Sequence, residues 1–167
     1  NKFIVHARIA ILGGLSPKQN RTVPPLNYDR VFRLKQSHPE LEIVLNGGIQ
    51  SLTQVDDVLQ HVDGVMIGRA AYQTPWVLAD VDRRFYGAGE TDLTPWDVAD
   101  AMVEYAARRM AEGVPLKSIT RHLLGLFQGC AGARAWRRHL SENAFRDDAR
   151  PELIREAAEL VPRRQAA

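Results

Sequence analysis

Short apolar runs alternate with amphipathic stretches along the first 70 residues. Three runs have the length and β-branched content of buried strands, at Phe3–Val5, Ile43–Leu45 and Val65–Ile67. The stretches between them, Tyr28–Gln36 and Leu52–His61, carry apolar residues at helical spacing. Strands that alternate with helices predict βαβ units around a parallel sheet.

Local signals add detail to this α/β part. The first apolar segment, Lys2–Ala7, is expected to be a strand covered on both faces. Because a domain rarely begins inside its own sheet, we expect sequence to precede Asn1, which is not a methionine. Ser51 is the predicted N-cap of the second helix. The loop Ile9–Asn27 is long for a βα connection, and long ordered loops are usually functional.

After the third strand the pattern becomes helical only. A helix is expected from about Pro75 to Phe85, followed by a linker that begins at Gly87. Thr94 is a predicted N-cap for a helix that runs to about Glu112. Shorter helices are expected at Ser118–Phe127, Ala133–Asn143 and Pro151–Leu160. The chain is therefore divided into an α/β part, residues 1–88, and an all-α domain, residues 89–167.

Composition narrows the class of protein. The 167 residues are 45% hydrophobic and 25% charged, which is typical of globular domains and excludes a disordered tail. With Cys130 as the only cysteine, no internal disulfide can form, and a reducing compartment such as the cytoplasm fits best. No apolar run approaches the roughly 18–20 residues that span a bilayer, so no membrane partner is expected.

Charge is distributed unevenly between the two halves. Residues 1–104 carry a net charge of −3 and residues 105–167 a net charge of +5. Within the basic half, Arg134, Arg137 and Arg138 share one helical face by their spacing. Such a face can follow a phosphate backbone, with Trp136 stacking on a base, or it can be an ordinary solvated face with Trp136 in the core. The spacing leaves both interpretations open.

Two glycine motifs follow predicted strands. Asn46-Gly47-Gly48 and Gly68-Arg69 each stand where a parallel strand ends and a helix approaches. Glycines there let the backbone come close to a ligand, and an arginine adds a bidentate phosphate contact. TIM barrels commonly bind phosphate at the loops after strands seven and eight, so the pair favours phosphate binding over two simple tight turns. In that frame Phe3–Val5 is strand six.

Two further residues are candidates for chemistry. His6 ends the first strand and is followed by Arg8, on the face where barrel enzymes collect functional residues. A structural histidine and a functional one are equally compatible with that position. Cys130 has no partner at metal-ligand spacing and is best explained as a small loop residue.

Longer segments of the chain resemble the bacterial tRNA-dihydrouridine synthases over nearly its whole length. The resemblance rests on residues 3–8 (FIVHAR), 14–21 (GLSPKQNR), 23–31 (VPPLNYDRV), 45–49 (LNGGI), 63–73 (DGVMIGRAAYQ) and 119–129 (ITRHLLGLFQG). Residues 133–143 (ARAWRRHLSEN) resemble the A-type subfamily.

The resemblance implies a fold and an activity. It implies that the chain holds the last three βα units of an FMN-binding TIM barrel, followed by a C-terminal helical domain that holds tRNA. The implied reaction is the reduction of a D-loop uridine, at positions 20 and 20a, to 5,6-dihydrouridine. NADPH is the implied electron donor to FMN, and the target base must be flipped out of its stack to be reached.

The resemblance also assigns residues. His6 matches the family histidine near the flavin. Asn46, Gly47 and Gly48 match the first phosphate loop, and Gly68 and Arg69 match the second. Four further residues match positions that face tRNA, namely Lys18, Arg21, Arg134 and Arg137.

One departure from the family pattern is large. The family's cysteine acid and flavin-ring lysine belong to an N-terminal half that is not in this sequence, and Cys130 does not match that acid. We therefore expect no catalytic residue here, no activity from this chain alone, and the N-terminal half of the barrel as a partner. Two other functions stay open at this point: an FMN or phosphate-binding barrel oxidoreductase with a small substrate, and a non-catalytic tRNA-binding module.

Overall fold

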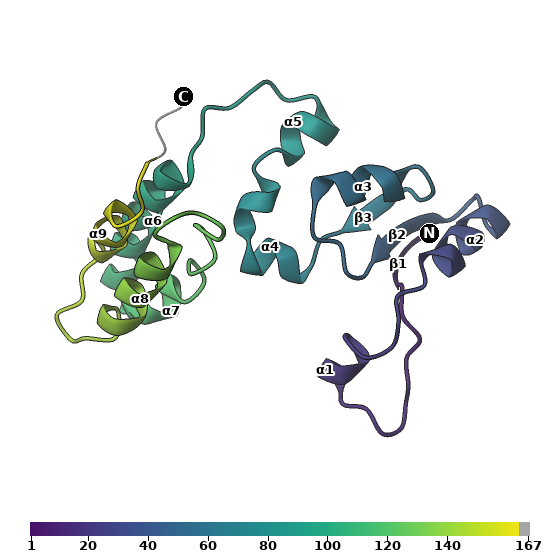
Figure 1. Ribbon diagram of the computed structural model, residues 1–167, viewed down its shortest axis with the longest axis horizontal. Helices are drawn as coiled ribbons and strands as arrows, with labels where there is room; N and C mark the ends of the chain where they lie inside the picture. Colours follow the sequence, from purple (N-terminus) through teal and green to yellow (C-terminus); the bar gives the residue numbers. More distant parts are fainter. Residues whose placement is uncertain (164–167) are drawn as a thin grey trace. The chain divides into compact units, whose positions relative to one another are not determined.

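The fold is described from a computed structural model, which defines residues 1–163 (Figure 1). The chain divides into two compact units, Asn1–Ala71 and Tyr72–Ala167, and each is described by itself. The division falls earlier than the expected boundary at residue 88. The last four residues of the expected helical domain, 164–167, lie outside the described part of the chain. No helix within residues 1–163 is long and apolar enough to cross a membrane.

The first unit is built on a three-stranded parallel sheet. The strands are β1 (Lys2–His6), β2 (Glu42–Asn46) and β3 (Gly64–Met66), in the order β1-β2-β3. The register pairs His6 with Asn46, and Asn46 with Met66. The parallel βα arrangement expected from the hydrophobic pattern is confirmed.

Burial differs sharply between the strands. In the central strand β2, Ile43 and Leu45 are completely buried. In β1, by contrast, Phe3 is 46% exposed and Ile4 is 59% exposed. The expectation that β1 is covered on both faces is therefore wrong for the described residues. The reason lies in the packing, because α2 packs against β2 and α3 against β3, whereas β1 pairs with β2 alone.

Two capped helices connect the strands. Helix α2 (Tyr28–Ser37) begins where the Asn27 side chain accepts a hydrogen bond from the backbone N–H of Arg30. Helix α3 (Leu52–Leu59) begins at Ser51, whose hydroxyl accepts a hydrogen bond from the N–H of Gln54. The predicted cap at Ser51 is confirmed, and its mechanism is the usual one of satisfying a free N–H at a helix start.

The long loop after β1 is closed by its own hydrogen bonds. It contains the short helix α1 (Pro17–Asn20), which a Ser16–Gln19 capping box starts. The Asn20 side chain bonds the N–H and the carbonyl of Ile11 at 2.8 and 2.9 Å. At the base of the loop, the Arg8 guanidinium donates to the Pro24 carbonyl. The loop therefore has a defined shape.

After β3 the chain forms three short helices rather than one long helix. They are α4 (Arg69–Gln73), the 3₁₀ helix η1 (Pro75–Leu78) and α5 (Val81–Tyr86). The expected helix from Pro75 to Phe85 is thus interrupted at Ala79 and Asp80. The backbone of Asp80 leaves helical geometry, and Asp80 is the N-cap residue of α5. Gly87 ends α5 in the left-handed conformation that favours glycine.

The second unit contains four further helices in its described part. They are α6 (Pro95–Ala111), α7 (Leu116–Thr120), α8 (Ala133–Asn143) and α9 (Leu153–Glu159). Thr94 caps α6 together with Asp97 in a capping box, as predicted in part by the Thr-Pro pair. Helix α8 has the predicted bounds. The predicted helix Ser118–Phe127 is wrong, because the helix ends at Thr120 and turns follow.

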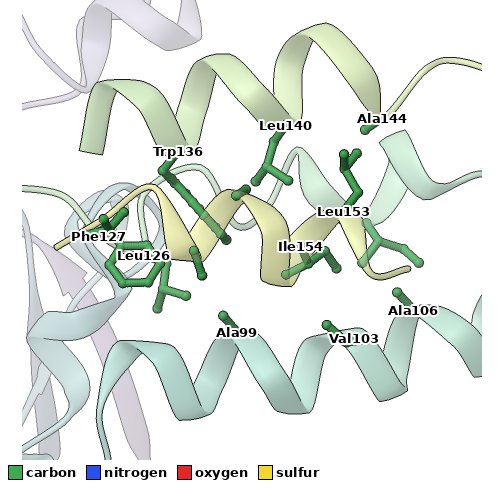
Figure 2. Packing of buried hydrophobic residues seen from close by; sticks show 14 of the residues in the cluster. Ala99, Val103, Ala106, Leu126, Phe127, Trp136, Leu140, Ala144, Leu153 and Ile154 are labelled. Carbon is green, nitrogen blue, oxygen red and sulfur yellow. The ribbon is translucent and has the colours of Figure 1, made fainter. Parts of the chain in front are cut away.

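An aromatic cluster forms the core of this helical unit. Trp136 and Phe127 are fully buried, with ring centroids 4.8 Å apart and edge-to-face geometry. The Trp136 Nε1–H donates to the Leu123 carbonyl at 3.1 Å, so the buried indole has its partner. Figure 2 shows Trp136 and Leu140 of α8 pointing toward α9, with Ala99, Val103 and Ala106 of α6 on the opposite side. Small residues on α6 let the helices approach closely.

Tyr72, Gln73 and Trp76 precede helix α6 in the chain, and they belong to the second unit because they contact its other residues. The Tyr72 hydroxyl and His122 Nδ1 lie 2.9 Å apart, and Trp76 packs against the core cluster. Gly125 lies directly on the backbone of Gln73, where a Cβ would come within 2.7 Å of the carbonyl carbon. These contacts shift the unit boundary to residue 72, ahead of the linker that the sequence suggested.

Gly125→Ala tests this close backbone contact. The added methyl group has no room against Gln73, so we expect a loss of about 1–3 kcal/mol in the free energy of unfolding. Gly89→Ala is the matched control, since a Cβ at Gly89 meets nothing within 4 Å. Urea unfolding followed by circular dichroism measures both. Equal stability of the two variants would contradict the contact.

Candidate functional site

The parallel register brings the predicted phosphate motifs to one edge of the sheet. His6, Asn46 and Met66 are register partners at the carboxyl ends of β1, β2 and β3. The loops that follow these ends carry the remaining residues of the predicted cofactor set, namely Gly47, Gly48, Gly68 and Arg69. All six predicted residues therefore lie within the first unit and along the edge where α/β proteins bind ligands.

The first glycine loop is fixed by contacts inside the protein. Gly47 and Gly48 have φ values of 139° and 71°, a region that favours glycine. A Cβ on Gly48 would lie 2.6 Å from Cδ1 of Leu26. The Tyr28 hydroxyl donates to the Gly47 carbonyl at 2.5 Å. The glycines are therefore required by internal packing and by the turn itself.

Leu26 and Tyr28 are residues to which the sequence reasoning assigned no role. Both stand at the end of the long loop, in the Pro-Pro-Leu-Asn-Tyr segment that enters α2. Through them the loop after β1 determines the shape of the loop after β2. A leucine and a tyrosine spaced two residues apart are ordinary helix-entry residues, so the sequence offered no separate signal for this contact.

The second motif is open to solvent. A Cβ at Gly68 would meet nothing within 4 Å, and Arg69 is exposed at the start of α4. No internal contact within the described residues therefore explains the glycine. An exposed arginine beside free space can reach a bound anion, which fits the chemistry that the motif predicts.

Positive charge surrounds the histidine at this edge. Partial desolvation, followed by the positive charges of Arg8, Arg69 and Arg21, lowers the pKa of His6 below its usual value near 6.5. No carboxylate contributes to this shift. The lowered pKa favours the neutral form of His6, and the three arginines provide a cationic environment that suits a phosphate group.

The two loop residues predicted to face tRNA are both exposed. Lys18 lies in α1, and Arg21 is the residue that ends it. Because the charge of Arg21 acts on His6, Arg21 belongs to the cationic edge as well as to the loop. Lys18 has no such effect and faces solvent.

The burial of Trp136 decides between the two interpretations of that residue on the basic face of α8. The indole is fully buried, so it packs in the core and is not available to stack on a base. Arg134 and Arg138 are exposed and have no ion-pair partner among residues 1–163. The Arg137 guanidinium donates to the side-chain carbonyl of Gln128 at 3.0 Å. Gln128 is a positioning contact that sequence reasoning missed.

Cys130 lies exposed in the turn before α8. Within residues 1–163 no group of three metal-ligating side chains forms a metal site.

These features define a class of protein. A parallel sheet carries a cationic, phosphate-suited edge, and a separate helical unit carries exposed arginines. The model of the dihydrouridine synthase family matches residues 1–161, and the chain belongs to this family of enzymes.

Curated relatives agree with that assignment. The chain is 52% identical over 159 residues to the tRNA-dihydrouridine(20/20a) synthase of Salmonella typhi, which covers 95% of the chain and 48% of the relative. It is 53% identical to the Escherichia coli K12 protein of the same name, with 95% and 46% covered. The protein of that name from Haemophilus ducreyi is 46% identical, with 95% and 49% covered. The chain spans about half the length of the curated relatives it matches.

The charge around His6 can be measured directly. We expect NMR titration to give a pKa for His6 below 6.5, and Arg69→Gln to raise it because one positive charge is removed. Since the unfolded chain binds this proton first as the pH falls through 6.5, the His6 contribution to stability is present above that pH and is lost below it. Arg33→Gln, an exposed change on α2, serves as the control. An unchanged pKa in Arg69→Gln would contradict the cationic edge.

Proposed function

We propose that this chain works in the reduction of D-loop uridines of tRNA, at positions 20 and 20a, to 5,6-dihydrouridine. The identity of 52% over 95% of the chain to a tRNA-dihydrouridine(20/20a) synthase carries the proposal. The geometry supports it, because a phosphate-suited strand edge and an exposed arginine face supply what a nucleotide cofactor and an RNA substrate each need. The same assignment argues against a small-substrate oxidoreductase. The proposed substrate also implies a cytoplasmic protein.

The three strands are proposed to be the last three of an FMN-binding (β/α)₈ barrel. Support comes from the edge strand β1, whose apolar side chains Phe3 and Ile4 are exposed and suited to burial against further barrel elements. The carboxyl ends of β2 and β3 then correspond to the phosphate loops of such barrels. The helical unit is proposed as the tRNA-holding domain.

FMN is the proposed cofactor, and the residues present fit it. Its phosphate would lie at the open Gly68-Arg69 motif and the Asn46-Gly47-Gly48 loop, where the cationic edge favours a dianion. When bound, FMN would supply the hydride, obtained from NADPH, that reduces the double bond of the uridine. The proposed role of His6 is at the flavin ring. As a neutral imidazole it has one N–H donor and one acceptor nitrogen, so it can orient the ring by hydrogen bonding without adding charge.

The tRNA would be held from both units. Lys18 and Arg21 would contact RNA phosphates from the long loop after β1. Arg134 and Arg137 would do so from α8, with Gln128 holding the Arg137 guanidinium in place. Phosphate contacts of this kind fix the position of the RNA and make its affinity dependent on salt.

Flavin binding tests the cofactor site. The purified chain is expected to quench FMN fluorescence and to show a bound-flavin absorption spectrum, and Arg69→Gln is expected to weaken binding about tenfold or more, as loss of a charge-assisted hydrogen bond does. Arg108→Gln is the matched control, an exposed arginine on α6 in the other unit. Absence of a flavin spectrum in the unaltered chain would contradict a working phosphate site here. Equal affinity of the two variants would contradict the role of Arg69.

Affinity for tRNA tests the substrate. We expect Arg134→Ala combined with Arg137→Ala to weaken binding and to reduce the salt slope by about 1.5, since each lost phosphate contact contributes roughly 0.7–0.9. Filter binding of a tRNA transcript between low and moderate salt gives both quantities. Arg108→Ala on α6 is the control, an exposed arginine outside the α8 face. A double variant that behaves like this control would argue against the α8 face as the RNA contact.

A further inference from the structure

A small cleft between α7 and the end of α8 has no part in the functions above. Its volume is about 220 Å³, below the roughly 300–1,000 Å³ of pockets that enclose a drug-sized ligand. It lies entirely within the helical unit, which has its own buried core. The walls come from segments far apart in sequence, so tertiary packing creates the cleft.

The cleft combines a cationic rim with an apolar floor. Lys117 and Arg121 line it from α7 and its C-cap, and no acidic residue is among its lining. Both cations are exposed and have no ion-pair partner among residues 1–163. Leu124 and Leu140 supply apolar wall, and the Ser141 hydroxyl adds a polar group. This arrangement suits an anion that carries an apolar, planar group.

An aromatic side chain completes the cleft. Phe145 lines it and is nevertheless 62% exposed. It follows directly after Ala144, which is buried and caps α8, so its backbone is held in place. The cleft therefore combines an exposed phenyl ring on a fixed backbone with two unpaired cations. Sites that stack a base and hold its phosphates have the same composition.

The cleft also continues the arginine face of α8. Residues 134, 138 and 141 follow one another on α8 at helical spacing of four and three, and Phe145 lies in the turn directly after the C-cap Ala144. A strand of RNA held by Arg134 and Arg137 would therefore reach the cleft at the C-terminal end of α8. Two cations with no acidic residue beside them suit RNA, which carries a phosphate at every nucleotide.

We propose that this cleft is a second RNA contact that takes one unpaired nucleotide of the tRNA, with its base stacked on Phe145 and its flanking phosphates held by Lys117 and Arg121. The proposal rests on the proposed function, since it takes tRNA as the ligand. It extends that function by adding a contact to a base, where the α8 arginines contact backbone alone. Stacking of this kind tolerates any base, so the cleft adds affinity without reading sequence.

The test uses the full chain with two probes, a tRNA transcript and a single-stranded pentamer of uridine. Phe145→Leu keeps an apolar side chain and removes the aromatic face, and we expect at least fivefold weaker binding of both probes. Phe145→Trp keeps the stacking face and is expected to retain affinity, and RNA is expected to quench its emission more than it quenches the three tryptophans of the unaltered chain. Lys117→Gln combined with Arg121→Gln is expected to reduce the salt slope by about 1.5.

Arg108→Gln is the matched control, because it removes an exposed charge from α6 outside the cleft. Circular dichroism and melting temperature show whether each variant is folded. The proposal is overturned if Phe145→Leu binds both probes as the unaltered chain does, or if the double variant changes the salt slope no more than Arg108→Gln. It is also overturned if RNA quenches the emission of Phe145→Trp no more than that of the unaltered chain, which would leave a protein partner as the better occupant.

Failure of this proposal is distinguishable from failure of the proposed function. A chain that binds tRNA through Arg134 and Arg137, yet is unaffected by the cleft variants, refutes the cleft and leaves the function standing. A chain that binds the uridine pentamer with the expected Phe145 dependence, but does not prefer tRNA, supports the cleft and contradicts the proposed substrate. If the unaltered chain binds neither probe, both proposals are contradicted.

Discussion

The parallel register of the three strands is the constraint on which the phosphate-suited edge depends. Because His6 pairs with Asn46, and Asn46 with Met66, three loops leave the sheet at the same level. A shift of one residue would turn every side chain of a strand to the other face and displace its loop. The register is stabilised by the buried strand β2 and by the contact of Leu26 and Tyr28 with the glycine loop. Segments far apart in sequence therefore stabilise the same register.

In the helical unit, the burial of Trp136 has a comparable effect. The indole packs against Phe127 and donates to the Leu123 carbonyl, which fixes the rotation of α8 about its axis. A helix with one fixed face must present the opposite face to solvent, and Arg134 and Arg138 stand there. The core and the candidate RNA surface are therefore two consequences of one amphipathic pattern.

Much of the local structure was predictable because its causes are local. Ser51 and Thr94 cap their helices through hydrogen bonds to residues three positions away, and such pairs are visible in sequence. The bounds of α8 follow from its amphipathic spacing. The turns after Thr120 were not predictable, because the chain leaves helical geometry to pack Gly125 on Gln73 and to offer the Leu123 carbonyl to Trp136.

The sequence by itself determined the alternation of strands and helices, the two glycine motifs, the basic character of the second half and the resemblance to a family of tRNA-modifying enzymes. These depend on residue type, spacing and short-range hydrogen bonds. Tertiary structure alone decided that β1 is exposed, that Trp136 lies in the core, that three arginines act on His6, and that Phe145 shares a cleft with two cations. Each of these depends on contacts between residues far apart in the chain, for which periodicity carries no signal.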